Sequence, residues 1–428
     1  MQHTLNISTA EIPMETGPPE EGKLNVSEFY RGATVLITGG TGFIGKVLVE
    51  KLLRCFEVKK IFLLIRPKRN IGPSERLQKM LEGPIFDTIR NTKANAQQLF
   101  RKVIAMEASF EQTDIVDDVN KTKICNEVQR IYDDIPFGGL DHITQMLEKL
   151  DTREKERMTQ LVLGEMPNSY VFSKKCAEVM IGRDFRHLPI GIFRPPIVIS
   201  SYREPEPGWI DCFHGATGLC VPVVVGKPMW YYGIPEVKPF MTPVDYTVAG
   251  MIAAACDISR RQDSILPMEK SVPVYNYTFE KNAFPFASLV ELVSSGLPNP
   301  VDRFLAGIKV RISPWKIFPK ILLWLMTLQA RIADEVLAWF GKRGSNVKVV
   351  SAISTLANAV EFFRCRMWTM DNGNVKRMIS LLSSDDAKRL DIDADRIDWR
   401  DYYKSFAKGI AMELMRKARS RQQRPKSI

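Results

Sequence analysis

The sequence predicts an α/β protein with a doubly wound parallel sheet in its first part and a mainly helical C-terminal part. Residues 33–38 form a short apolar, β-rich run that is typical of a buried strand. A glycine-rich turn follows, then an amphipathic stretch over 44–55 and a second apolar run over 60–65. Strand, turn, helix and strand in this order form a βαβ unit, which implies parallel strands. From about residue 285 the hydrophobic pattern is mostly helical.

The glycine-rich turn is the strongest local signal. It consists of Thr38, Gly39, Gly40, Thr41, Gly42, Phe43, Ile44 and Gly45. Its glycines have G-x-x-G-x-x-G spacing, which lets the backbone approach a pyrophosphate, and the following helix N-terminus offers N–H donors and a positive dipole end. Because the turn follows a predicted strand and opens a predicted helix, it predicts a Rossmann-type dinucleotide site. A tight turn without a ligand is the alternative.

The end of the second predicted strand is positively charged. Sites selective for NAD usually carry an acidic residue near this point, which binds the ribose hydroxyls. Here Arg66 occupies the position, with Lys68 and Arg69 beside it. A guanidinium suits the 2′-phosphate of NADP through charge-assisted contacts, so the sequence favours NADPH as the cofactor. A solvated basic loop is the alternative.

Tyr170 and Lys174 form a third motif. Residues four apart share one face of a helix, and the stretch 169–185 is predicted to be helical. A neighbouring ammonium favours the phenolate and lowers the pKa of a tyrosine, which prepares Tyr170 to give a proton to a carbonyl oxygen as hydride arrives. Lys174 is also suited to hold the nicotinamide ribose. A Tyr and a Lys four residues apart are common by chance, but the glycine turn upstream makes a catalytic role for this pair better supported.

The predicted sheet lacks part of its strands. Residues 102–106 read as a third strand, but 107–168 contain no convincing buried strand, and their best periodic segment, 141–163, is helical. The pattern resumes with the helix at 169 and a strand within 188–198. A doubly wound sheet of order 3-2-1-4-5-6 needs its fourth and fifth strands in this gap. We therefore predict an incomplete Rossmann-type sheet.

Taken together, these motifs resemble those of the alcohol-forming fatty acyl-CoA reductases of the short-chain dehydrogenase/reductase superfamily. The resemblance extends over about residues 29–415 and is carried by the blocks TVLITGGTGFIGKVLVEKLLR, LLIRPK, PNSYVFSKKCAE, LPIGIFRPPIV, EPEPGWID and TPVDYTVAGMIAAA. The C-terminal part, through Arg396-Ile397-Asp398-Trp399 and Tyr402-Tyr403, resembles the "male sterility" domain of that family. The resemblance implies reduction of long-chain acyl-CoA to alcohol through an aldehyde, with the glycine turn and Arg66 at NADPH and Tyr170 and Lys174 in catalysis.

The chain departs from that family in the middle of the predicted sheet. The family's Gly-Asp after the third strand is replaced by Met106-Glu107-Ala108-Ser109, and its motifs at the ends of the fourth and fifth strands are absent. We place the join at 121–124. The absent part would include the Ser/Thr that assists the tyrosine at the substrate oxygen, so we expect impaired catalysis. A catalytically inactive lipid- or membrane-associated remnant of the same family is the alternative.

We expect four regions. Residues 1–28 are predicted to be a disordered leader, 29–284 the NADP-binding reductase domain, 285–415 a helical domain and 416–428 a basic tail. The formal net charge is +11. The basic tail is interpreted first as a solvated helix end and second as a contact for an anionic membrane. Nucleic acid is a less favoured partner, because no aromatic residues interleave with the basic ones. Scattered cysteines and isolated histidines indicate no metal site.

A membrane surface is a further expected partner. The run 321–328 is strongly apolar but too short to span a bilayer, so the stretch 315–340 is read as a buried core helix, a re-entrant hairpin or an interfacial helix. We predict attachment to the cytosolic face of an intracellular membrane. The final tripeptide Lys426-Ser427-Ile428 is not the peroxisomal Ser-Lys-Leu signal, which favours the endoplasmic reticulum. A sterol dehydrogenase or sugar epimerase is a weaker reading, because the helical C-terminal third argues against it.

Overall fold

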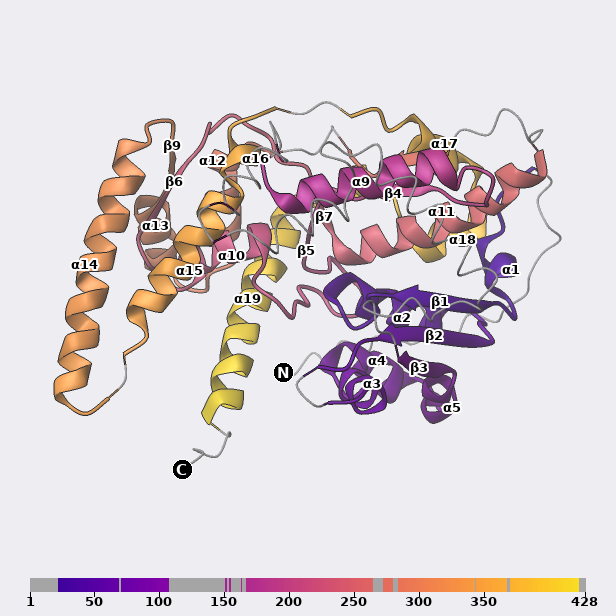
Figure 1. Ribbon diagram of the computed structural model, residues 1–428, viewed down its shortest axis with the longest axis horizontal. Coiled ribbons are helices and arrows are strands. Elements are labelled where there is room, and N and C mark those ends of the chain that lie inside the picture. Colours follow the sequence, from indigo (N-terminus) through magenta and orange to yellow (C-terminus); the bar gives the residue numbers. More distant parts are fainter. Residues whose placement is uncertain are drawn as a thin grey trace, which may run out of the picture.

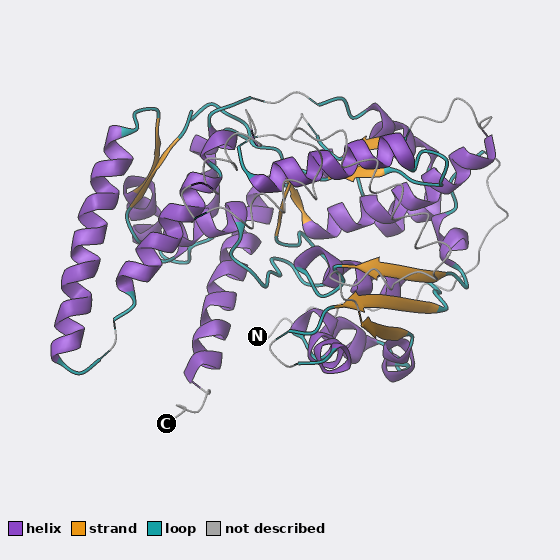
Figure 2. Ribbon diagram, viewed as in Figure 1, coloured by secondary structure: helices purple, strands orange, loops and turns teal. Residues whose placement is uncertain are grey.

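The fold combines a parallel sheet region with a helical region (Figures 1 and 2). The computed structural model describes residues 22–68, 71–107, 151, 154, 163, 167–264, 272–279, 284–342, 344–367 and 370–422. Figure 1 shows the sheet region on the right, a group of helices on the left and the long helix α19 (Trp399–Gln422) between them. Every strand pair among the described residues is parallel, as the βαβ pattern predicts.

The first sheet matches the sequence prediction closely. Strands β1 (Thr34–Thr38), β2 (Lys60–Ile65) and β3 (Val103–Glu107) lie side by side in the order β1-β2-β3, with helix α2 (Phe43–Cys55) crossing from β1 to β2. Apolar side chains of α2 and β2 are buried in the same hydrophobic core. Between β2 and β3 the chain forms the short helices α3 (Pro73–Leu81), η1 (Pro84–Phe86), α4 (Asp87–Thr92) and α5 (Ala96–Arg101).

Strand β1 lies at an open edge of this sheet. In the part of the chain that the structure describes, β1 pairs with β2 alone. Leu36 in the middle of β1 is 59% exposed, although the first strand of a complete doubly wound sheet is central. The structure thus agrees with the prediction of an incomplete sheet. The expected helix over 141–163 and the join at 121–124 lie outside the described residues.

The later strands form separate two-stranded sheets. Strand β4 (Ile192–Arg194) pairs with β8 (Val274–Asn276), and β5 (Ile197–Ile199) pairs with β7 (Met241–Pro243). Helix α9 (Ser169–Asp184) precedes β4, and the long helix α11 (Val244–Ser264) follows β7 and packs on α2. Among the described residues β4 pairs only with β8 and β1 only with β2, so β4 does not take the position next to β1.

The parts of the chain on either side of the expected domain boundary at 284/285 pack closely against each other. Strand β6 (Met229–Tyr232) pairs with β9 (Val310–Ser313), and α10 (Gly215–Val224) packs against α12 (Phe286–Ser294) and α19. Conversely, α17 (Gly373–Leu381) and α18 (Ser384–Leu390) pack on α11, and the short turn η2 (Ala394–Arg396) follows them and precedes α19. One continuous hydrophobic core joins the two regions.

The N-terminal leader is shorter than expected, because residues 22–28 belong to the fold. Leu24 forms a β-bridge with Leu382, and helix α1 (Val26–Tyr30) begins directly afterwards. The buried carboxylate of Asp386 accepts hydrogen bonds from the backbone N–H groups of Val26 and Ser27, at 2.6 and 3.3 Å. The prediction of disorder up to residue 28 rested on the proline- and glutamate-rich residues 13–21. It was wrong for residues 22–28, because Leu382 and Asp386, which are distant in the sequence, bind this segment.

Helices α14 (Ile317–Trp339) and α15 (Asn346–Ala359) form an antiparallel pair at the left of Figure 1, next to α13 (Pro300–Lys309) and the single turn α16 (Glu361–Arg364). Three structures were predicted for 315–340. A buried core helix is wrong, because Ala330 is the one buried residue of α14. A re-entrant hairpin is wrong, because 317–339 is a single helix. Its exposed face is apolar, with Ile321, Trp324, Leu325, Leu328, Ile332 and Val336. No helix among the described residues is long and apolar enough to cross a membrane.

Candidate functional site

The glycine turn brings the end of β1 close to the start of α2. Gly39 has φ of +67°, a left-handed conformation that glycine adopts without strain. A Cβ on Gly45 would collide with the carbonyl oxygen of Gly39 and with Gly40, and a Cβ on Gly40 would lie 2.8 Å from the side chain of Leu63. Gly39 and Gly45 are therefore required by the backbone geometry itself, whereas a Cβ on Gly40 would have to displace the Leu63 side chain.

The N-terminus of α2 is open to an anion. Gly42 is its N-cap, and no side chain caps the helix, although 13 residues of aligned peptide dipoles end there. Gly39 and Gly42 are exposed, while Thr41, Phe43 and Ile44 are half-buried around them. Free helical N–H groups beside an exposed glycine backbone fit the pyrophosphate of a dinucleotide. The residues of the predicted turn, Thr38 to Gly45, therefore fit the cofactor.

Arg76 on α3 also belongs to this site, and the sequence motifs did not reveal it. Its guanidinium donates through Nη2 to Thr41 Oγ1 at 3.3 Å and through Nη1 to the carbonyl oxygen of Arg66. Arg66 itself is exposed in the loop after β2. Arg76 thus links the glycine turn to this loop and adds a second cation there. No spacing rule connects residues 41, 66 and 76, so only the folded chain shows the link.

Ion pairs hold α2 to the loop over 202–211. Lys46 Nζ lies 2.7 Å from Asp211 Oδ2, and Glu204 Oε2 lies 2.6 Å from Lys51 Nζ and 3.0 Å from Arg54 Nη2. Burial would raise the pKa of the Glu204 carboxyl, but Lys51 and Arg54 outweigh this effect and lower the pKa to about 2. These contacts fix the helix that carries the glycine turn.

A buried carboxylate shapes the same loop. Asp245, at the start of α11, accepts hydrogen bonds from the backbone N–H groups of Tyr202, Arg203 and Glu204 at 2.9, 2.9 and 3.0 Å. Burial raises the pKa of Asp245, and these three bonds oppose the rise. The ring of Trp209, in the same loop, stacks on Phe43 at the start of α2 with 5.4 Å between ring centroids. The loop therefore flanks the predicted cofactor site.

Tyr170 and Lys174 lie on one face of α9, as predicted. The Lys174 Nζ is 5.7 Å from the centre of the Tyr170 ring, and Tyr170 is 68% exposed. Among the described residues, no hydrogen bond, ion pair or ring contact joins either side chain to the glycine turn. No described side chain of α9 is buried, and Glu178 connects the helix to Arg194 of β4. The pair thus forms on α9, and among the described residues neither side chain touches the glycine turn directly.

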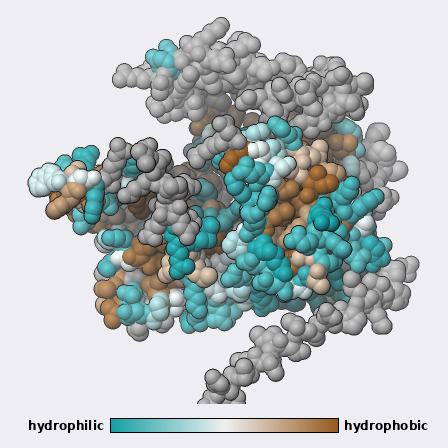
Figure 3. Space-filling view, turned by 90° about the horizontal axis from the view of Figure 1, so that it is seen from below, coloured by the Kyte–Doolittle hydropathy of each residue, from teal (hydrophilic) through white to brown (hydrophobic). Residues whose placement is uncertain are grey.

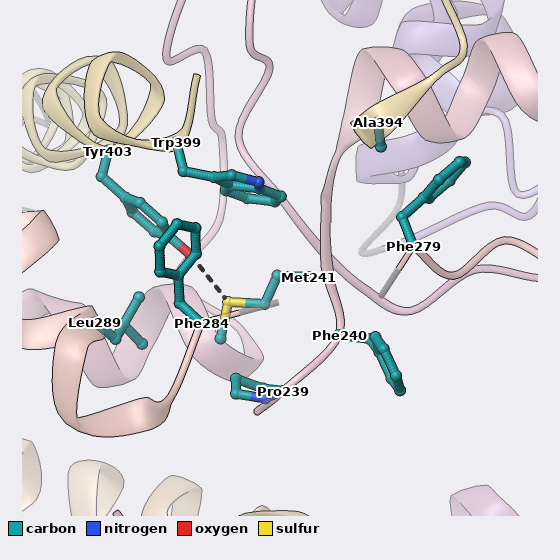
Figure 4. Close-up of a pocket in the computed structure, with 9 residues that line it drawn as sticks. All are labelled: Pro239, Phe240, Met241, Phe279, Phe284, Leu289, Ala394, Trp399 and Tyr403. Carbon is teal, nitrogen blue, oxygen red and sulfur yellow. Dashed lines mark hydrogen bonds between the residues drawn. The ribbon is translucent and has the colours of Figure 1, made fainter. Parts of the chain in front are cut away.

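An apolar pocket lies where the helical region meets β7 (Figure 4). The side chains of Trp399 and Tyr403 from α19 and of Phe284 and Leu289 converge around Met241. Tyr403 donates its hydroxyl proton to Met241 Sδ at 3.5 Å, and the buried indole Nε1 of Trp399 has no partner among the described residues. Both aromatic residues belong to the C-terminal motif of the sequence. The pocket offers an apolar wall and one unused hydrogen-bond donor.

Comparisons with known proteins agree with these features. The NAD-binding profile described as "Male sterility protein" matches residues 37–135 and 137–251, and a second profile of the same description matches residues 325–417. Fatty acyl-CoA reductase wat of Drosophila melanogaster is 26% identical, covering 91% of this chain and 85% of the relative. Fatty acyl-CoA reductase 1 of Homo sapiens is 24% identical, covering 90% and 85%. The terminal reductase domain of a myxalamid biosynthetic pathway has 16% identity and a TM-score of 0.49, covering 93% of this chain and 96% of that one.

The alignments also bear on the incomplete sheet. The alignment with the Drosophila relative is 451 positions long, whereas the chain has 428 residues in all. Parts of that relative therefore have no counterpart in this chain. The NAD-binding profile likewise matches in two pieces that meet at residue 136.

Proposed function

The chain belongs to the male sterility protein family, and from this membership we propose that it is a reductase of long-chain fatty acyl-CoA that uses NADPH and is impaired in this form. The observation that carries the proposal is the glycine turn, in which the exposed, uncapped N-terminus of α2 fits a dinucleotide. The curated relatives, which are named fatty acyl-CoA reductases, suggest the substrate. When bound, one NADPH would supply the hydride that converts the thioester to an aldehyde with release of the CoA thiol, and a second NADPH would supply the hydride that converts the aldehyde to an alcohol.

The residues of this chain have distinct roles in that reaction. Thr38 to Gly45 would hold the pyrophosphate, and Arg66, with Arg76 beside it, would hold the adenosine 2′-phosphate. Tyr170 would give its phenolic proton to the substrate oxygen as hydride reaches the carbon, and Lys174 would stabilise the resulting phenolate and hold the ribose. The apolar pocket around Met241 offers a place for the acyl chain. The positive charges of Arg66, directly after β2, and of Arg76 beside it favour NADPH over NADH.

Cofactor titration tests this proposal. Calorimetry of the purified chain should show NADPH binding more tightly than NADH, and Arg66→Ala should remove most of that difference. Lys59→Ala, an exposed cation before β2, is the matched control and should keep it. Equal affinity of the unsubstituted chain for both cofactors would contradict the NADPH assignment.

A catalytically inactive, lipid- or membrane-associated remnant is the second candidate. The observations that favour it are the exposed Tyr170, the unburied helix α9 and the open edge of β1. The apolar face of α14 would bind the cytosolic face of an intracellular membrane, the endoplasmic reticulum before the peroxisome. Reduction of a long-chain aldehyde by the purified chain with NADPH distinguishes the two, because the remnant would bind lipid without consuming cofactor.

A further inference from the structure

Helix α19 is linked to the glycine turn through the loop over 200–211. The hydroxyl group of Tyr402 on α19 donates to the carbonyl oxygen of Ser200 at 2.8 Å. Further along the helix, a Cβ on Gly409 would collide with the carbonyl oxygen of Gly208, and a Cβ on Gly208 would collide with the backbone of α19. The backbones of the loop and the helix therefore touch directly. The same loop contacts α2, so it connects the C-terminal helix with the helix that carries the glycine turn.

Asp211, at the end of this loop, contacts both helices. Its carboxylate Oδ2 lies 2.7 Å from Lys46 Nζ on α2, and its carbonyl oxygen accepts a hydrogen bond from Lys417 Nζ on α19 at 3.1 Å. The Asp211 and Lys46 side chains are 17% and 25% exposed, so water screens this pair less than a surface pair. Lys417 Nζ also lies 4.3 Å from the centre of the Phe213 ring. A charge-assisted hydrogen bond and a cation–π contact thus hold the Lys417 ammonium at the loop.

Lys46 belongs to the first turn of α2, where the pyrophosphate would bind. Its backbone N–H donates to the carbonyl oxygen of Gly42, the N-cap, at 3.0 Å. Phe43, the first residue of the helix, stacks on Trp209 of the loop with 5.4 Å between ring centroids and 7° between the ring planes. The loop therefore holds this turn at two points, by one ion pair and one ring stack. A helix N-terminus binds an anion best when its N–H groups are already in place.

We propose that Lys417 is a positioning residue for the cofactor, which acts through Asp211 and Lys46 on the N-terminus of α2. Without the Lys417 contact, the loop would lose its hold at Asp211, and the ion pair and the ring stack would order the glycine turn less well. NADPH binding would then have to restore that order at a cost in affinity. The inference rests on the proposed function, because it assumes that the glycine turn binds NADPH. It assigns the C-terminal helix a role in cofactor binding.

Arg416 provides the matched control on the same helix. The side chain of Glu413 is 4% exposed, and its carboxylate lies 2.6 Å from Arg416 Nε and 3.2 Å from Lys417 Nζ. Either cation can therefore be removed without leaving this buried carboxylate unpaired. Lys417→Met removes the contact with Asp211, whereas Arg416→Met removes the same charge one residue away and keeps that contact.

Calorimetric titration of the full chain with NADPH measures the effect. It is carried out in about 0.15 M salt, where a screening length of about 8 Å limits the direct effect of a lost charge on the cofactor. Lys417→Met should weaken NADPH binding by about three- to thirtyfold, the range expected for coupling through a contact network. Arg416→Met should change it by less than about twofold. In a Lys46→Met background, Lys417→Met should have little further effect, because its route to the glycine turn is already broken.

A ¹⁹F spectrum of the chain labelled with 5-fluorotryptophan reports on the loop without any ligand. Trp209→Phe identifies the resonance of Trp209. This resonance should move in Lys417→Met and stay in place in Arg416→Met, which a loss of stability alone would not produce. Lys417→Gln keeps a hydrogen-bond donor and covers the case in which Lys417→Met does not fold in urea denaturation. It should give a smaller shift and a smaller loss of NADPH affinity.

The outcomes separate this inference from the proposed function. Equal NADPH affinity of Lys417→Met and Arg416→Met overturns the inference and leaves the proposed function standing. Fully additive effects of Lys417→Met and Lys46→Met, or an unmoved Trp209 resonance in folded Lys417→Met, overturn it as well. If the unsubstituted chain binds no NADPH, the proposed function fails and the inference fails with it.

Discussion

At the scale of single residues, the glycine turn has no room for a Cβ atom at Gly45. Gly45→Ala would place a Cβ against the carbonyl oxygen of Gly39 and the backbone of Gly40, where neither atom can move without opening the turn. Overpacking of this kind typically costs about 1–3 kcal/mol of unfolding free energy. We therefore expect Gly45→Ala to lower stability by that amount in urea denaturation and to abolish NADPH binding in calorimetry.

The matched control for this substitution lies on α9. Gly182 is also helical, but nothing lies within 4 Å of the position that its Cβ would take. Gly182→Ala should stabilise the chain by roughly 0.5–1 kcal/mol, because alanine has the better helix propensity. NADPH affinity of Gly45→Ala equal to that of Gly182→Ala would show that the turn does not hold the cofactor.

A second residue-scale prediction concerns pH. The pKa of Glu204 is lowered to about 2: burial opposes this, but Lys51 and Arg54 dominate. A carboxyl whose folded pKa lies below its unfolded value, ordinarily near 4.3, stabilises the fold above that unfolded value. This contribution should be lost as the pH falls from about 4.3 to about 2. Urea denaturation across this range should show a smaller loss of stability in Glu204→Gln than in the unsubstituted chain.

Glu206 provides the control in the same loop. It is exposed, so Glu206→Gln should leave the pH dependence of stability unchanged. Because Glu204 is itself partly exposed, solvent screening reduces the effect below that of a fully buried pair. Identical pH profiles for Glu204→Gln and the unsubstituted chain would show that the ion pairs with Lys51 and Arg54 contribute little to folding.

At the scale of elements, the exposed face of α14 has the properties of an interfacial helix. Its apolar side chains recur at helical spacing and remain in solvent, and Figure 3 shows hydrophobic surface on the left, where α14 lies in Figure 1. An exposed apolar stripe of this extent is typical of a site that contacts another surface. We expect Ile321→Glu with Leu328→Glu to release the chain from vesicles that contain anionic lipid, as measured by co-sedimentation.

This double substitution should leave stability almost unchanged, because both side chains are already in solvent. Gln329→Glu adds a negative charge at another exposed position of the same helix and serves as the control for charge alone. Vesicle binding that survives the double substitution would assign membrane contact to another part of the chain. A large drop in melting temperature would instead show that the face of α14 packs against protein in solution.

The sequence predicted local elements well and their assembly poorly. The strand over 60–65 and the helix over 169–185 were found to within one residue, since an apolar run or a capping residue such as Asn168 acts locally. The sequence did not reveal that the parts on either side of 284/285 pack together, because β6 and β9 pair across more than 70 residues and no periodicity records such a pairing. Arg76 was missed for the same reason, since its hydrogen bonds reach residues that are distant in the sequence.

At the scale of the whole molecule, we expect slow turnover. The glycine turn is intact, yet Tyr170 is exposed and does not contact that turn among the residues that the structure describes. Misplacement of a catalytic group by about 1 Å can cost ~10²-fold in rate. Absence of the Ser/Thr expected at the substrate oxygen would cost roughly a further 10²–10³-fold.

The assay for this prediction is NADPH-dependent alcohol formation from acyl-CoA substrates of several chain lengths, with Tyr170→Phe as the blank. We expect a rate far below that of the Drosophila relative but above the blank. Robust alcohol formation that Tyr170→Phe abolishes would show that α9 reaches the cofactor in solution. The incomplete sheet would then be compatible with catalysis.

The open edge of β1 gives the last prediction. In a complete doubly wound sheet the first strand is central, and a charge at any of its positions would be buried. Here Leu36 is 59% exposed whereas its neighbour Ile37 is 6% exposed. Leu36→Lys should therefore change the unfolding free energy by no more than about 0.5 kcal/mol. It should also reduce aggregation, because a charge on an unpaired strand edge discourages edge-to-edge pairing.

Ile37→Lys is the matched comparison on the same strand and should cost about 2–5 kcal/mol, since it removes a buried side chain and buries a charge. Urea denaturation measures both variants, and light scattering measures their aggregation. If Leu36→Lys destabilises the chain as strongly as Ile37→Lys, the edge of β1 is covered in solution, and the sheet is completed by a partner strand. If Leu36→Lys leaves the unfolding free energy unchanged and reduces aggregation, the edge of β1 is exposed to solvent. The sheet then lacks the strand that pairs with the first strand in a complete doubly wound sheet.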